Sequence, residues 1–222
     1  MINPKTIFEC LGTATLVFTI QVASSDLAPI AIGAILISIV FAGGPISGAH
    51  YNPAVSLAVA LRGSMEYDEM IQYIISQVVG GIVGGLCGGI VSSSSSVVAM
   101  GDDATNLQAI LAEVIFTFIL CFVVLSVATN PKVENNNYYG LAIGLVVVSG
   151  AITVGGISGG AFNPAVVLGL SISSGFSGLV YGCLVIVSNL LGGCAAAGCF
   201  LLVVPSEDDA VGTGESAPLN RA

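Results

Sequence analysis

The chain has 222 residues, of which 55% are hydrophobic and only 8% are charged, and its formal net charge is −9 at pH 7. No soluble domain of this length hides that much apolar surface in one core, so the composition predicts an integral membrane protein. The negative charge argues against a nucleic-acid partner. The first nine residues lack a basic region leading to a cleavage site, so we expect the first apolar run to be retained.

Six apolar runs have the length of about 18–24 residues that suits a bilayer core. They lie near residues 6–23, 28–45, 69–92, 107–128, 138–156 and 178–204. Two shorter apolar runs begin at Asn52 and Asn163. Each lasts about ten residues, or about 15 Å at helical rise, which covers only half of a bilayer.

Each short run belongs to one of two near-copies of a single segment. The copies are Ile-Ser-Gly-Ala-His-Tyr-Asn-Pro-Ala-Val at 46–55 and Ile-Ser-Gly-Gly-Ala-Phe-Asn-Pro-Ala-Val at 157–166. An Asn at the N-cap followed by Pro at the first helical position is typical of a helix start. The sequence therefore predicts three spans and one half-helix, repeated.

An odd number of spans per repeat makes the second repeat enter the membrane inverted, so that the two half-helices meet tip to tip at the midplane. Irregular backbone at that depth is tolerated only where it lines a polar cavity or is buried in protein. The repeat therefore predicts a pore or a midplane binding site.

We expect one channel domain at 1–204, with repeat one at about 4–92 and repeat two at about 106–204. The residues at 205–222 are acidic and small, which predicts a disordered tail.

The four basic residues predict the orientation, because in a six-span topology all of them fall on one side. By the positive-inside rule that side is cytosolic, and both termini lie there. The pattern does not distinguish the plasma membrane from an intracellular one. The basic residues are Lys5, Arg62, Lys132 and Arg221.

Two further patterns predict helix packing. Glycine pairs recur every four residues at Gly80, Gly84 and Gly88, a spacing that allows close helix crossing. A lone Asn189 in the last span is typical of a hydrogen bond between helices, with a role as a pore ligand as the alternative.

The paired Asn-Pro-Ala triplets resemble those of the major intrinsic protein family, the aquaporins and glycerol facilitators. The resemblance covers roughly 4–204. It includes a glutamate near the start of each repeat and the flanking Ser-Gly pairs. It implies an all-α membrane protein with six transmembrane helices plus two re-entrant half-helices in an inverted repeat, an aquaporin-like right-handed bundle. It also implies a homotetramer in which each subunit has its own pore.

In that family the two motifs meet in the pore. Their asparagine NH₂ groups, together with two positive helix ends, would orient a passing water molecule and repel cations. The residues at the motif positions are Asn52, Pro53, Ala54, Asn163, Pro164 and Ala165.

Three ionisable residues stand near the motifs. Glu9 and Glu113 lie inside predicted spans, where an acid is costly and usually functional. The resemblance suggests that they support the loops by accepting backbone N–H groups, with a proton relay as the alternative. His50 either braces its loop or gates the pore with pH.

The predicted constriction departs from the family. Members usually carry Arg directly after the second Asn-Pro-Ala, where this chain has Val166, and the other three constriction positions fall on Ile32, Ala151 and Gly160. All four are apolar and two are very small. We therefore expect a wide constriction without charged donors that passes water, glycerol, urea and similar solutes, unless nearby side chains fold into the gap.

Other functions fit less well. An enzyme is disfavoured because the chain has one His and no nucleophile–base pair or metal-ligand cluster. A secondary transporter is disfavoured because it would need an acidic coupling site at the midplane, whereas Glu9 and Glu113 are explained by support of the loops. Within the family, a water-only channel or a low-permeability junctional member is the alternative. We expect no cofactor and no metal, and we expect water, small neutral solutes and the lipid bilayer as partners.

Overall fold

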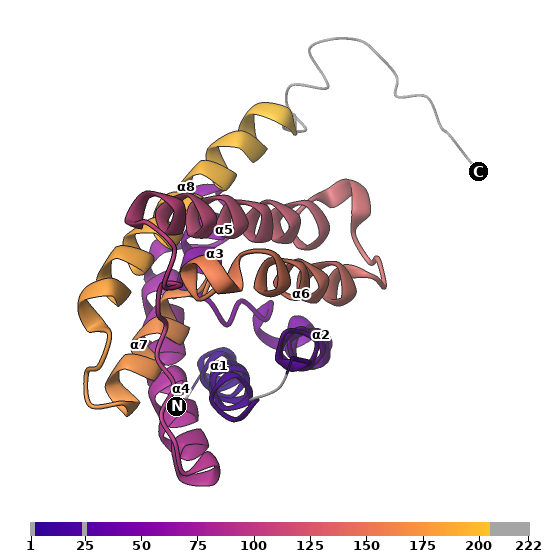
Figure 1. The fold of residues 1–222 in the computed structure, drawn as a ribbon. Coiled ribbons are helices and arrows are strands. Elements are labelled where there is room, and N and C mark those ends of the chain that lie inside the picture. The colour runs from indigo at the N-terminus through magenta and orange to yellow at the C-terminus, as the bar shows by residue number, and fades with distance from the viewer. Residues whose placement is uncertain (1–2, 24–25, 205–222) are drawn as a thin grey trace, which may run out of the picture.

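The computed structural model describes residues 3–23 and 26–204, which form eight α-helices and one short 3₁₀ turn (Figure 1). The predicted acidic tail at 205–222 lies outside the described residues. The elements are α1 (Pro4–Val22), α2 (Ala28–Ser47), α3 (Pro53–Leu61), α4 (Tyr67–Ser92), α5 (Asn106–Ala128), η1 (Pro131–Val133), α6 (Tyr139–Ser158), α7 (Pro164–Ser173) and α8 (Leu179–Val203).

The six predicted spans correspond to the six long helices, and the two predicted half-helices to α3 and α7. Within the described residues, α2, α4, α5, α6 and α8 are long and apolar enough to cross a membrane. The remaining long helix, α1, has 19 residues and carries Lys5, Glu9 and Gln21, which make it more polar.

Helix α1 runs parallel to α4 from end to end. Near their starts, Lys5 Nζ and Glu69 Oε1 form an ion pair at 2.7 Å. At the end of α1, the Gln21 side chain donates to the carbonyl of Ser94, which follows α4, at 2.9 Å. Parallel α1 and α4 are what three spans and a half-helix per repeat require.

Glycines on two faces of α4 allow neighbouring helices to approach closely. A methyl group built on Gly80 or Gly84 would collide with a carbonyl oxygen of α1, and one on Gly85 would lie 2.8 Å from the Gly169 carbonyl of α7. The predicted packing role of these glycines is therefore confirmed. Small residues at such crossings let backbones meet in van der Waals contact.

The half-helices form the centre of the bundle although they are too short to cross it. Helix α3 packs against α4, α5 and α8, and α7 packs against α1, α4 and α8. The two also contact each other. Seven of the nine residues of α3 are buried, because long helices surround it (Figure 1).

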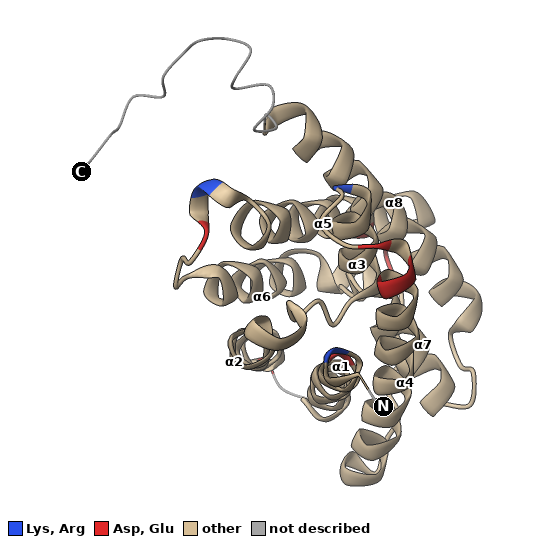
Figure 2. Cartoon of the chain, turned by 180° about the vertical axis from the view of Figure 1, so that it is seen from behind, with Lys and Arg blue, Asp and Glu red and all other residues tan. Residues whose placement is uncertain are grey.

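Charged residues concentrate in connectors and at helix ends (Figure 2). Arg62 follows α3 and donates to the Thr129 carbonyl at 2.8 Å, which places it near Lys132 in η1. The Lys5–Glu69 ion pair joins the starts of α1 and α4, and α4 itself begins five residues after Arg62. The three described basic residues therefore lie at one end of the bundle.

Replacing Gly84 by Val should loosen the α1–α4 contact, because the new side chain has no room beside the Ala14 carbonyl. Overpacking of this kind costs about 1–3 kcal/mol. We expect thermal unfolding in detergent, followed by circular dichroism, to occur at lower temperature.

The matched control is Gly198→Val in α8, where the added methyl group meets nothing within 4 Å. Equal melting temperatures for the two variants would contradict the packing role of Gly84.

Candidate pore

Each half-helix begins at a capped asparagine. The Oδ1 atoms of Asn52 and Asn163 accept the N–H groups of Ala54 and Ala165, both at 2.9 Å. Both asparagines have extended backbones, and Pro occupies the first helical position after each. Proline costs nothing at this position because its missing N–H would have had no partner in the helix.

The two caps are tied to each other across the repeat interface. Asn52 Nδ2 donates to the Phe162 carbonyl at 2.8 Å, and Asn163 Nδ2 donates to the Tyr51 carbonyl at 2.9 Å. An amide NH₂ carries two hydrogens, so each asparagine keeps one donor beyond this bond. The crossed bonds fix the direction in which that donor points.

The loops before both half-helices use the left-handed backbone repeatedly. This conformation is unusual for residues other than glycine, and a loop that contains it several times needs outside support. The residues with positive φ are Gly48, Ala49, Tyr51, Gly159, Gly160 and Phe162.

Glu9 supplies that support in repeat one from within α1. It is fully buried and accepts the backbone N–H groups of His50 and Tyr51 at 3.0 and 2.7 Å. It also accepts from the Ser47 hydroxyl and the Gln77 amide, both at 2.7 Å. Four donors satisfy a carboxylate that has no cationic partner among these contacts.

Glu113 has the same arrangement in repeat two from within α5. It is fully buried and accepts the N–H groups of Ala161 and Phe162 at 3.0 and 2.9 Å. The Ser158 hydroxyl donates at 2.8 Å and the Asn189 amide at 2.7 Å. The bond from α8 to α5 confirms the predicted interhelical role of Asn189.

His50 continues the polar network of repeat one. Its Nδ1 lies 3.0 Å from the Ser56 hydroxyl, which also accepts from Gln77 Nε2 at 2.9 Å. Its ring packs edge-on against Tyr73 with centroids 5.3 Å apart. The sequence carries a signal for this network in Gln77, a polar residue inside an apolar span that was not among the predicted site residues.

A cavity of about 250 Å³ runs past the two asparagines. Its lining includes Ile32, Ala151, Gly160 and Val166, the four positions expected at the constriction, so the fold brings them together. Apolar side chains dominate the remainder of the wall. The residues Pro53, Ala54, Pro164 and Ala165 are buried and are not among those that line it.

Part of this wall was not predicted from the sequence. Gly155 of α6 and the segment Ser96-Val97-Val98, from the connector between α4 and α5, also line the cavity. No local pattern in a serine-rich loop indicates that it reaches into the bundle.

A second cavity of about 620 Å³ opens on the other side of His50, which lines both. Its wall is more polar than that of the first cavity. It includes Asn130, Glu134 and Asn136, from the segment between α5 and α6, and Tyr139 at the start of α6. The two cavities adjoin at His50 and Val124, which line both.

Comparisons with known proteins agree with this architecture. The family model described as "Major intrinsic protein" matches residues 4–152 and 135–220. The chain belongs to the major intrinsic protein family. Its members are channels rather than enzymes, so this chain is a membrane channel for water and small solutes.

Similar proteins come from bacteria and plants. A glycerol uptake facilitator protein-like protein of Lactiplantibacillus plantarum is 33% identical over 224 residues, covering 92% of this chain and 99% of that protein. Aquaporin NIP1-2 of Arabidopsis thaliana is 33% identical, covering 90% and 74%. The X-ray structure of the aquaglyceroporin from Plasmodium falciparum superposes with a TM-score of 0.77 at 22% identity, covering 90% and 96% of the two chains.

Replacing Glu113 by Gln should destabilise the protein. The amide has one acceptor oxygen where the carboxylate has two, and its NH₂ would face donors of the loop. Hydrogen bonds to charged groups contribute about 1.5–3 kcal/mol each, so we expect a loss of about 3 kcal/mol and a lower melting temperature in detergent.

The matched comparison is Glu9→Gln, for which the same loss is expected in repeat one. If the glutamates instead relayed protons, replacing either by Gln would leave the stability unchanged and abolish proton flux into vesicles. That result would contradict the supporting role of the glutamates.

Proposed function

We propose that this chain is a passive channel for water and for small uncharged solutes such as glycerol and urea. In this proposal Asn52 and Asn163 contact the solute at the midplane. The narrowest part of the pore is bounded by Ile32, Ala151 and Gly160 together with Val166.

The observation that carries the proposal is the chemistry of the cavity wall. Asn52 and Asn163 are polar residues in a wall made mostly of aliphatic side chains, and no Lys, Arg, Asp or Glu lines it among the described residues. A solute that passes must leave part of its hydration behind and find only a few partners. Neutral molecules tolerate this, whereas ions do not.

Size is the second argument. The wall has glycine at Gly155 and Gly160, and a methyl group added to Gly155 would meet nothing within 4 Å. An arginine at the position of Val166 would fill part of such a space and add a fixed positive charge. Without it, cation exclusion rests on the positive ends of α3 and α7.

One observation favours the narrower alternative, a channel for water alone. Val97 and Val98 of the connector also line the cavity and reduce its width. Flux measurements separate the two possibilities.

In stopped-flow light scattering, we expect proteoliposomes containing the protein to shrink quickly as water leaves under an osmotic gradient. They should then reswell quickly when the added solute is glycerol or urea. Replacing Val166 by Arg should lower glycerol and urea flux about tenfold while water flux persists, because a filled apolar pocket rejects larger solutes by roughly this factor.

The control Val166→Leu adds volume without charge and therefore separates size from electrostatics. Wild-type water flux without glycerol or urea flux would contradict the proposed solute range. An unchanged glycerol flux in Val166→Arg would contradict the position of the constriction.

We further propose a homotetramer with both termini in the cytosol. Apolar side chains such as Ile75, Ile90 and Ile152 cover the outer surface of the subunit and suit contact with lipid or with another subunit. The basic end of the bundle suits the cytosolic face.

We expect light scattering of the purified protein, corrected for bound detergent, to give the mass of four subunits. A C-terminal epitope should be inaccessible to antibody in intact cells and accessible after permeabilisation. A particle with the mass of one subunit would contradict the homotetramer. An epitope that is accessible on intact cells would contradict the cytosolic C-terminus.

A further inference from the structure

Gln21, at the end of α1, is a buried polar residue that supports neither half-helix loop. It is 3% exposed, and both ends of its amide bind one backbone segment. Nε2 donates to the Ser94 carbonyl at 2.9 Å, and Oε1 accepts the Ser96 N–H at 3.1 Å. The side chain thus pairs with the connector as a neighbouring strand would.

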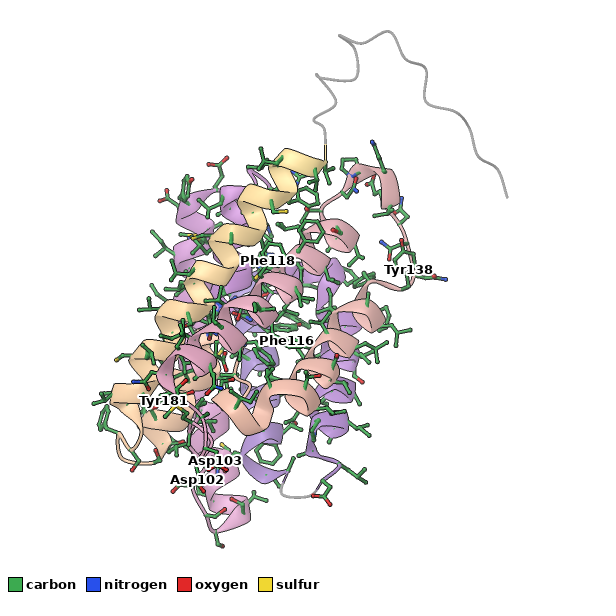
Figure 3. All side chains as sticks on the ribbon, turned by 45° about the horizontal axis from the view of Figure 1, so that its top comes forward. Asp102, Asp103, Phe116, Phe118, Tyr138 and Tyr181 are labelled. Carbon is green, nitrogen blue, oxygen red and sulfur yellow. The ribbon has the colours of Figure 1, made fainter. Side chains whose placement is uncertain are left out.

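The connector continues from this clamp directly into the cavity. Ser96, Val97 and Val98 line the same cavity as the predicted constriction, and Val98 is only 6% exposed. In Figure 3, Asp102 and Asp103 of this connector lie at one end of the bundle, and Tyr138, before α6, lies at the other. The connector therefore lies at the mouth of the cavity opposite the basic end.

A second anchor holds the connector against the end of α6 and against Gly159, which follows it. Gly101 donates its N–H to the Ile157 carbonyl at 3.1 Å. A methyl group added to Gly159 would lie 2.9 Å from both Val98 Cγ1 and the Ala99 carbonyl oxygen. Val98 therefore sits against the residue that precedes Gly160 of the constriction.

We propose that Val98 is a further specificity-determining residue of the pore and that Gln21 is the positioning residue that holds it there. The inference rests on the proposed channel function. A constriction of small apolar residues sets a loose size limit, and a valine brought in from the connector tightens that limit without adding a hydrogen-bond donor.

The clamp is needed because the connector has no regular secondary structure at this point. Backbone groups without partners are costly when buried, and the Gln21 amide satisfies one carbonyl and one N–H at the same time. The Ser94 carbonyl also accepts the Ser92 hydroxyl at 3.2 Å, so the bond that matters more is the one from the half-buried Ser96 N–H. Without it, the Ser96 N–H regains a hydrogen bond by moving toward water, and Val98, two residues further on, moves with it.

The test compares Val98→Ala, Val98→Phe and Gln21→Met with the wild type in proteoliposomes, using water, glycerol and erythritol on the same preparation. We expect Val98→Ala and Gln21→Met to raise the ratio of erythritol to water flux about tenfold, the effect of a small volume change in an apolar site. Val98→Phe should lower the ratio of glycerol to water flux.

The matched control is Val91→Ala on the outer surface of α4, where the side chain is 63% exposed. It should leave every ratio unchanged. Ratios are the readout because a variant that merely misfolds lowers all fluxes together. Hydrogen–deuterium exchange should also be faster at the Ser96 amide in Gln21→Met, because that N–H has lost its acceptor.

Wild-type flux with unchanged ratios in all three variants would overturn this inference and leave the proposed function standing. Flux of glycerol or erythritol that appears only in Val98→Ala and Gln21→Met would support the inference and correct the proposed solute range. Absence of flux in the wild type and in every variant would overturn both.

Discussion

Two buried carboxyl groups hold the centre of this protein together. Each loop before a half-helix adopts a left-handed backbone at several residues, and a loop of this shape leaves N–H groups pointing inward. Glu9 and Glu113 each collect two such N–H groups and two side-chain donors, so the loops are supported from helices α1 and α5. The half-helices, their asparagine caps and the crossed bonds between the caps all depend on loops held in this way.

The two repeats share this plan but differ in polarity. In repeat one, His50 and Ser56 extend the network from Glu9 toward the second cavity. In repeat two, the corresponding motif positions are Ala161 and Val167, and the network runs instead through Asn189 to the Thr117 hydroxyl. The cavity near the basic end of the bundle is therefore the more polar of the two, and the cavity beside the connector is the more apolar. This difference suits a filter that selects by size on one side of the asparagines and by hydrogen bonding on the other.

Size selection in such a filter depends on parts of the chain that are distant in sequence. The four expected constriction positions come from α2, α6, the loop before α7, and α7 itself. The connector adds Val98, and its place depends on Gln21 more than seventy residues earlier. An apolar wall built in this way has no charged group to attract or reject a neutral solute, so its geometry has the larger influence.

The sequence by itself determined the spans, the half-helices and the inverted repeat. Span length, N-cap chemistry and the copied motif are local patterns, and a bilayer admits few alternatives to them. Helix α1 was predicted as a span despite its polar residues, because the apolar run near residues 6–23 has the length that a bilayer core needs. Only the tertiary structure decided how the connector meets the cavity, and which polar residues pair with Glu9. Such pairings join residues far apart in the chain, and no local pattern encodes the distance between them.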